Sequence, residues 1–205
     1  MLFTDQERAT IEAAVREAEA TTSGEIVVVD VERSATYGTE RALAAALLAA
    51  ACATAMVLVA PHLPAPYYLL AQVPFFGLVW LLASTSRVQR LLAGGARMDA
   101  AARARAASLF SERGVHMTRE RTGVLLMLSE IERRVVILAD SGINARVAPD
   151  AWEKHVATIV DAIHRGAAGD GVASVVREVG TLLAKDFPRR PDDVNELPDR
   201  PERAG

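Results

Sequence analysis

The feature that most constrains this chain is a long central block without a single charged side chain. No Asp, Glu, Lys or Arg occurs between Ala42 and Ser86, although 24% of the whole chain is charged. Residues 42–60 form one apolar run and residues 67–83 another, and a segment with three prolines, 61–66, separates them. The first run would make a helix about 28 Å long, close to the hydrocarbon thickness of a bilayer. The block therefore predicts a transmembrane helical hairpin with a short turn, and argues against a wholly soluble globular protein.

Two other interpretations of this block stay open. The two runs could form a buried core hairpin of a soluble protein, or a re-entrant pair that enters the bilayer without crossing it. The second run is shorter and contains Pro74, so it could also be tilted or only partly embedded. A cleaved signal peptide is excluded by position, because 41 mostly polar residues precede the first run.

The basic residues that flank the block predict its orientation. The turn between the two runs has no Lys or Arg. The outer flanks carry several arginines: Arg33, Arg41, Arg87, Arg90, Arg97, Arg103 and Arg105. The positive-inside rule then places both termini and the soluble residues on the cytoplasmic side of the inner membrane. The net charge of −3 argues against a nucleic-acid partner, so the lipid bilayer is the expected one.

The polar residues on both sides of the block predict one α/β domain. Short apolar runs typical of strands occur at 25–31, 123–129 and 133–139. The last two runs are separated by a three-residue link, which predicts an antiparallel hairpin. Helical spacing or a helix cap marks four further segments, which are 4–21, 98–113, 150–166 and a last helix capped by Asp170. Together, these segments predict a small mixed sheet of at least three strands with helices around it.

These elements divide the chain into four parts. Residues 1–41 and 87–187 form the two halves of the α/β domain, and residues 42–86 are a hairpin inserted between them. Such an insertion needs its two ends close together in space, which an antiparallel hairpin provides. Residues 188–205 are rich in proline and charge, which predicts a flexible tail with little structure of its own.

No motif of known catalytic chemistry is present. The chain has no phosphate-binding glycine loop, no dinucleotide fingerprint and no nucleophile elbow. His155 and His164 are nine positions apart on one predicted helix, so they lie on nearly opposite faces and cannot share a metal. Acids at strand ends are the remaining candidates for cation ligands: Asp30 and Glu32 after the first strand, and Asp140 after the third. Loop carboxylates, however, more often cap helices or turns.

Several motifs, taken in order, resemble the TPM domain family once the charge-free block is removed. The stretches that carry the resemblance are TSGEIVVV (22–29), TGVLL (122–126), RRVVI (133–137) and ADSGI (139–143). The chain looks most similar to a bacterial subgroup of membrane proteins that carry a hairpin inside the domain. The resemblance implies a Rossmann-like α/β sandwich, tethering to a membrane, and a role in assembling or maintaining membrane complexes. It also implies divalent-cation binding and weak acid phosphatase activity, which are reported for some family members.

The chain departs from the family where such a cation would bind. The family has acids in the loop before the GVLL strand, where Arg121 stands here, and often a glutamate after the next turn, where Asn144 stands. Asp140 remains, and Glu120 and Asp170 could join it only if the fold brings them near. These three acids are the predicted metal ligands, for Ca²⁺ or another divalent cation. No catalytic residue is assigned, and no cofactor is firmly implied.

The substituted acids favour a membrane-anchored TPM-like domain that is not an enzyme and that binds a partner or assists the assembly of a membrane protein complex. The alternative is a divalent-cation-dependent phosphatase in which Asp140 and neighbouring acids hold the metal. A third hypothesis is a homo-oligomer formed through the hairpin. It follows from the small-residue faces of Ala44–Ala46 and Ala49–Ala51, which are suited to helix packing.

Overall fold

The structure is a computed structural model that describes residues 2–148 and 150–204. The chain divides into two compact units. The first unit contains the residues up to Ser34 together with those from Asp99 onward, and the second comprises residues 35–98. The predicted limits of the insertion, residues 42 and 86, both lie inside the second unit. The α/β class predicted from the sequence is confirmed.

The first unit is built on a four-stranded mixed sheet with the strand order β3-β2-β1-β4. Its strands are β1 (Glu25–Val31), β2 (Gly123–Ser129), β3 (Arg134–Ala139) and β4 (Glu202–Ala204). β1 pairs in parallel with β2 and β4, and β2 pairs antiparallel with β3, as the short link between them predicts. β1 and β2 are buried along their whole length, as expected for central strands made of apolar and β-branched residues.

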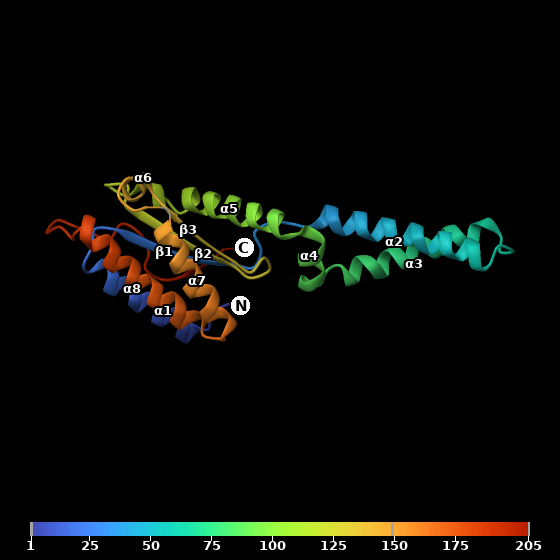
Figure 1. Ribbon diagram of the computed structural model, residues 1–205, viewed down its shortest axis with the longest axis horizontal. Coiled ribbons are helices and arrows are strands. Elements are labelled where there is room, and N and C mark those ends of the chain that lie inside the picture. The colour runs from blue at the N-terminus through green and yellow to red at the C-terminus, as the bar shows by residue number, and fades with distance from the viewer. Residues whose placement is uncertain (1, 149, 205) are drawn as a thin grey trace. The chain divides into compact units, whose positions relative to one another are not determined.

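Helices cover both faces of this sheet (Figure 1). They are α1 (Asp5–Glu19), α7 (Asp150–His164) and α8 (Ala168–Asp186) on one face, and α5 (Gly95–Glu112) on the other. Side chains of β1 alternate between the two sides. Ile26 and Val28 belong to the core that contains α1, α7 and α8, whereas Val27 and Val29 pack with residues of α5. The first unit is therefore a sandwich of three layers.

Local sequence explains how α1 begins and how closely α8 packs against it. The hydroxyl of Thr4 accepts a hydrogen bond from the Glu7 N–H at 3.2 Å, and the Glu7 carboxylate accepts the Thr4 N–H at 2.8 Å. Together these bonds form a complete capping box. Gly180 allows the close approach of α8 to α1, because a Cβ at that position would lie 2.4 Å from the Cβ of Ala18.

The second unit contains three complete helices, of which two are long and apolar, and the first residues of α5. These are α2 (Gly38–Val59), α3 (Ala65–Leu82) and α4 (Ser86–Ala93). By length and composition, α2 and α3 could each cross a membrane. Their most apolar windows are only 17% and 6% buried, whereas the core helix of a soluble protein is mostly buried. This exposure of apolar surface favours a lipid environment over the core of a soluble protein.

Small residues allow α2 and α3 to approach each other. Ala45, Ala49 and Ala53 are the buried residues of α2, and their spacing places them on one face. α2 and α3 contact each other along this hairpin, and the Tyr68 hydroxyl closes it by donating to the Ala60 carbonyl oxygen at 2.6 Å. Part of the small-residue face that suggested a homo-oligomer is therefore used within the chain.

The C-terminal segment, residues 188–204, lies against the first unit, which differs from the free tail predicted from its composition. The Arg189 N–H donates to the Thr21 carbonyl oxygen at 3.3 Å, and the Arg8 side chain donates to the Pro201 carbonyl oxygen at 3.0 Å. Ion pairs with arginines of the unit involve Asp192 with Arg119, Asp199 with Arg16 and Glu202 with Arg113. The segment takes its structure from the sheet edge and from these charges, neither of which is local in sequence.

Candidate functional site

Asp140 lies where β3 ends, and its carboxylate is almost buried, with the residue 7% exposed. It is the N-cap of the short helix α6 (Ser141–Asn144), and its Oδ1 accepts the Ser141 N–H at 2.6 Å. The other oxygen, Oδ2, is buried and accepts no hydrogen bond within the part of the chain that the structure describes. A buried carboxylate oxygen of this kind is costly unless a positive charge lies nearby.

The positive charge beside Asp140 belongs to Arg121. Its Nη1 lies 3.8 Å from Asp140 Oδ2 and donates a hydrogen bond to the carbonyl oxygen of His116 at 2.7 Å. Arg121 has a φ of 58°, in the left-handed region that residues with a side chain seldom adopt. Gly142 permits the close approach of this loop, because a Cβ there would lie 2.7 Å from the Arg121 carbonyl oxygen. A guanidinium thus stands where a metal site would need a further acid.

The second predicted ligand, Glu120, is paired with the C-terminal segment. Its carboxylate forms an ion pair with Arg190. The neighbouring Arg119 forms a second ion pair with this segment, at 2.9 Å from Asp192. The acid that remains close to Arg121 in sequence is therefore neutralised by an arginine from the end of the chain.

The third predicted ligand, Asp170, is far from Asp140. It lies in the first turn of α8 and is not the N-cap, since the helix begins at Ala168. The opposite end of α8 is the one near the start of β1, where the Phe187 carbonyl oxygen accepts the Ser23 N–H at 3.0 Å. The helix between these ends is about 24 Å long at ~1.5 Å per residue. Over residues 2–148 and 150–204, no group of three or more His, Cys, Asp or Glu is placed to hold a metal ion.

The strand-end acids Asp30 and Glu32 lie at the opposite edge of the sheet from Asp140. β3 runs antiparallel to β2, so its carboxyl end is at the edge where β1 and β2 begin. Asp30 is fully buried and forms an ion pair with Arg8 at 2.7 Å. Glu32 is exposed and pairs with Arg33 at 3.1 Å. The three strand-end acids therefore do not form one site.

A cluster of acids that the sequence did not reveal gathers beside the start of β1. It lines a cavity of about 180 Å³ together with two arginines, and its charged members are Glu19, Glu25, Asp193, Asp199, Arg16 and Arg189. Burial raises the pKa of Glu19 to about 8 and the pKa of Glu25 to about 7. Hydrogen bonds from the backbone oppose part of this effect, from the Ile26 N–H to Glu19 at 2.9 Å and from the Glu196 N–H to Glu25 at 3.2 Å.

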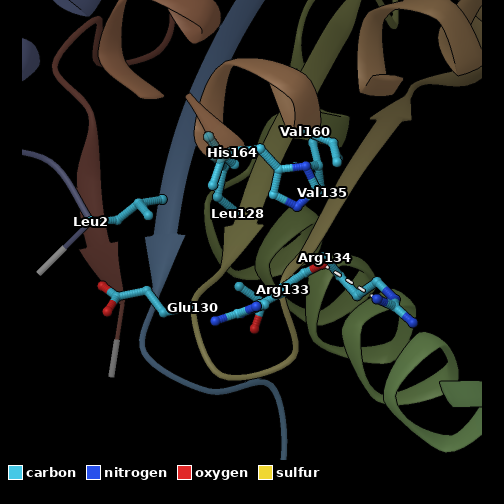
Figure 2. Close-up of a pocket in the computed structure, with 10 residues that line it drawn as sticks. Leu2, Leu128, Glu130, Arg133, Arg134, Val135, Val160 and His164 are labelled. Atoms are coloured by element: carbon cyan, nitrogen blue, oxygen red, sulfur yellow. Dashed lines mark hydrogen bonds between the residues drawn. The ribbon is translucent and has the colours of Figure 1, made fainter. Parts of the chain in front are cut away.

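A larger cavity, of about 500 Å³, lies at the other edge of the sheet, where β1 and β2 end. Figure 2 shows that its lining comes from the end of β2, the start of β3, the end of α7 and Leu2. His164 lines this cavity, whereas His155 is buried, with its Nδ1 3.3 Å from a carboxylate oxygen of Glu178. The two histidines of α7 thus lie in different surroundings.

The fold and one family comparison describe the class of this chain. It is an α/β sandwich on a mixed sheet, interrupted after its first strand by two helices that could span a membrane. Residues 88–182 match the family model of the TPM domain. This part of the chain is therefore similar to the TPM domain, as the motifs within it predict.

One solved structure is similar to the whole chain in fold. It is the NMR structure of the BA42 protein from the psychrophilic bacterium Bizionia argentinensis sp. nov., with a TM-score of 0.60 and 22% sequence identity. The alignment covers 98% of this chain and 95% of that chain. At this identity the similarity concerns the fold alone. No curated protein matches the chain.

Proposed function

We propose that this protein is a membrane-anchored TPM domain that binds a partner and assists the assembly or maintenance of a membrane protein complex, without catalysing a reaction. The observation that carries the proposal is the guanidinium of Arg121 at 3.8 Å from the Asp140 carboxylate. A hard divalent cation needs several oxygen ligands, and Glu120 is paired with Arg190. Asp140 and Glu120, two of the three predicted metal ligands, thus each have an arginine of the same chain as their counter-charge.

The second unit supports the anchoring part of the proposal. Large apolar side chains such as Leu47, Leu58 and Leu70 are more than half exposed on α2 and α3. A surface of this kind is unfavourable in water and favourable in lipid. Arginines flank the two helices and are missing from the turn between them. By the positive-inside rule, this pattern supports an orientation with both chain termini and the α/β domain on the cytoplasmic side of the inner membrane.

The way in which the domain is joined to the hairpin supports a role beside other membrane proteins. The first unit connects to the second at two points, after Ser34 and before Asp99. A domain attached through both ends of a membrane hairpin stays near the bilayer surface. Its encounters are therefore concentrated on proteins of the same membrane, which favours weak contacts that would not persist between free partners.

Crosslinking in cells, followed by purification in several mild detergents, tests this function. We expect one membrane protein to be recovered reproducibly with the full chain, and to be lost when only residues 35–98 are expressed, because the TPM domain makes the contact. The hairpin segment is the matched control, since it enters the same membrane. Recovery of the full chain alone in every detergent would contradict the proposal, as would equal recovery of the partner with the hairpin segment.

A divalent-cation-dependent phosphatase is the alternative, and one observation favours it. Asp140 Oδ2 is buried and accepts no hydrogen bond in residues 2–148 and 150–204, so it retains the capacity to bind a cation. In that case a metal would neutralise the phosphate of the substrate and activate water. Metal binding would have to displace Arg121. The alternative therefore predicts saturable binding of a divalent cation, whereas the proposed function predicts none.

A further inference from the structure

We propose that the 500 Å³ cavity at the carboxyl end of β2 and the start of β3 is a binding site for a phosphate ester, either the headgroup of a phospholipid or a soluble phosphate ester. This edge of the sheet is the one opposite Asp140. The site is thus separate from the acids discussed above, and its ligand chemistry follows from its own lining residues.

The polar part of the lining includes an arginine and a histidine that come from different elements. Arg133 comes from the turn before β3, and His164 is the last residue of α7 (Figure 2). Within the described residues, neither side chain forms an ion pair or a hydrogen bond. Arg134 also lines the cavity but pairs with Asp99. Arg133 and His164 therefore supply free donors to an anion, and a guanidinium can bind two oxygens of one phosphate group.

One carboxylate is also part of the lining and has to be considered. Glu130 lies in the same turn as Arg133, and Figure 2 shows its carboxylate directed away from the Arg133 side chain. A ligand anion placed between Arg133 and His164 would therefore not face the Glu130 oxygens directly.

The rest of the lining is apolar. Its members are Leu2, Leu128, Val135, Val160 and Ile163. Sites for small molecules commonly combine a mostly apolar wall with a few convergent polar groups, in cavities of roughly 300–1,000 Å³. A phosphate ester that also carries an acyl portion combines the same two properties. Its phosphate would lie at the arginine, and its apolar acyl portion would lie against the leucine and valine side chains.

The backbone conformation of Arg133 is unusual for an arginine, and it allows a substitution that removes the side chain without straining the turn. Its φ is 53°, in the left-handed region, where glycine is the residue without strain. A glycine at this position would keep the conformation of the turn while removing the guanidinium. Replacement by glycine therefore separates the loss of the cation from any loss of folding.

The position of the cavity favours a lipid as the source of the ester, and this step rests on the proposed membrane anchoring. Ser34, the last residue of the first unit before the insertion, donates its hydroxyl to Ser129 at 2.9 Å. Asp99, the first residue after the insertion, pairs with Arg134. Ser129 and Arg134 both line the cavity. The chain thus leaves and re-enters this unit at the cavity's own edge of the sheet.

Calorimetric titration of the full chain in a phosphate-free, non-ionic detergent tests the proposal with two probes. The probes are dihexanoyl phosphatidylglycerol, kept as monomers, and glycerol 3-phosphate. We expect saturable binding of at least one probe, weakened about tenfold or more in Arg133→Gly. Arg165→Ala is the matched control, because Arg165 follows His164, pairs with Asp161 and does not line the cavity. Its affinity should equal that of the unchanged protein.

The two probes distinguish the sources of the ester. Tighter binding of the lipid probe assigns the site to a phospholipid headgroup, and equal or tighter binding of glycerol 3-phosphate assigns it to a soluble ester. The proposal is overturned if neither probe binds saturably, or if Arg133→Gly binds as tightly as the unchanged protein at an unchanged melting temperature. Because both probes are soluble, none of these results depends on whether the hairpin crosses a membrane or on a protein partner.

Discussion

Replacing Arg8 by methionine is expected to lower the free energy of unfolding of the first unit, which contains the α/β domain, by about 3–5 kcal/mol. Arg8 is almost buried and lies 2.7 Å from Asp30, whose side chain is completely buried. Methionine fills similar space but leaves the Asp30 carboxylate without its counter-charge, and Asp30 Oδ2 already accepts no hydrogen bond within residues 2–148 and 150–204. The change also removes the bond from Arg8 to Pro201 that holds the C-terminal segment.

Urea unfolding followed by the fluorescence of Trp152 measures this effect. Trp152 is buried in the TPM domain, and Trp80 lies in α3, so a Trp80→Phe background restricts the signal to the domain. Arg165→Met is the control, because its pair with Asp161 is exposed on both sides and should change stability by less than about 1 kcal/mol. Equal losses of unfolding free energy in Arg8→Met and Arg165→Met would contradict the prediction that the buried Arg8–Asp30 pair contributes more than an exposed pair.

The stability of the TPM domain is also expected to fall as the pH rises from about 5 to about 8. Burial raises the pKa of Glu19 to about 8 and that of Glu25 to about 7, from the ordinary value of 4.5. At a pH between the ordinary pKa of 4.5 and the raised pKa of each group, the folded state binds more protons than the unfolded state. The free energy of unfolding therefore decreases as the pH rises through this range. The loss is absent below pH 4.5 and complete above pH 8. At about 1.4 kcal/mol per pKa unit, it amounts to several kcal/mol for the two groups together.

Replacement of Glu19 by glutamine should flatten this pH dependence. The amide oxygen can still accept the Ile26 N–H, which Glu19 accepts at 2.9 Å, while the ionisable group is removed. We expect Glu19→Gln to be more stable than the unchanged protein at pH 8 and similar to it at pH 4.5, measured by urea unfolding. Glu17→Gln is the control, because Glu17 is exposed and pairs with Arg177 on the surface. If the free energy of unfolding of Glu19→Gln depended on pH as steeply as that of the unchanged protein, the raised pKa of Glu19 would not be the cause of the pH dependence.

Patterns that act over short distances predicted much of this fold. The apolar runs predicted at 25–31 and 123–129 have the bounds of β1 and β2 as observed, because strands that are buried on both faces are mostly apolar. The helix predicted over residues 4–21 is observed as α1, whose N-cap is Thr4, since the Thr4–Glu7 capping box that starts it joins two residues within one helical turn. The link between β2 and β3 predicted their antiparallel pairing.

The parts that were missed depend on contacts between distant residues. The C-terminal segment has no apolar periodicity, and β4 forms only because β1 offers a free edge. Glu19, Glu25 and Asp199 meet at one cavity from three separate segments, so no spacing in the sequence could reveal the cluster. The sequence did predict that β3 is antiparallel to β2. Asp140 and Asp30 lie at opposite edges of the sheet only because β1 is also parallel to β2, a pairing between distant segments that the sequence analysis did not predict.

The most direct test of the account is a titration of the full chain, in detergent, with Ca²⁺, Mg²⁺ and Mn²⁺ while its melting temperature is followed. A ligand that binds only the folded state must raise the melting temperature in a saturable way. Because Arg121 stands beside Asp140 and Arg190 pairs with Glu120, the account predicts no saturable rise up to millimolar metal. A saturable rise that disappears in Asp140→Asn would contradict it and would establish the metal site that the phosphatase alternative requires.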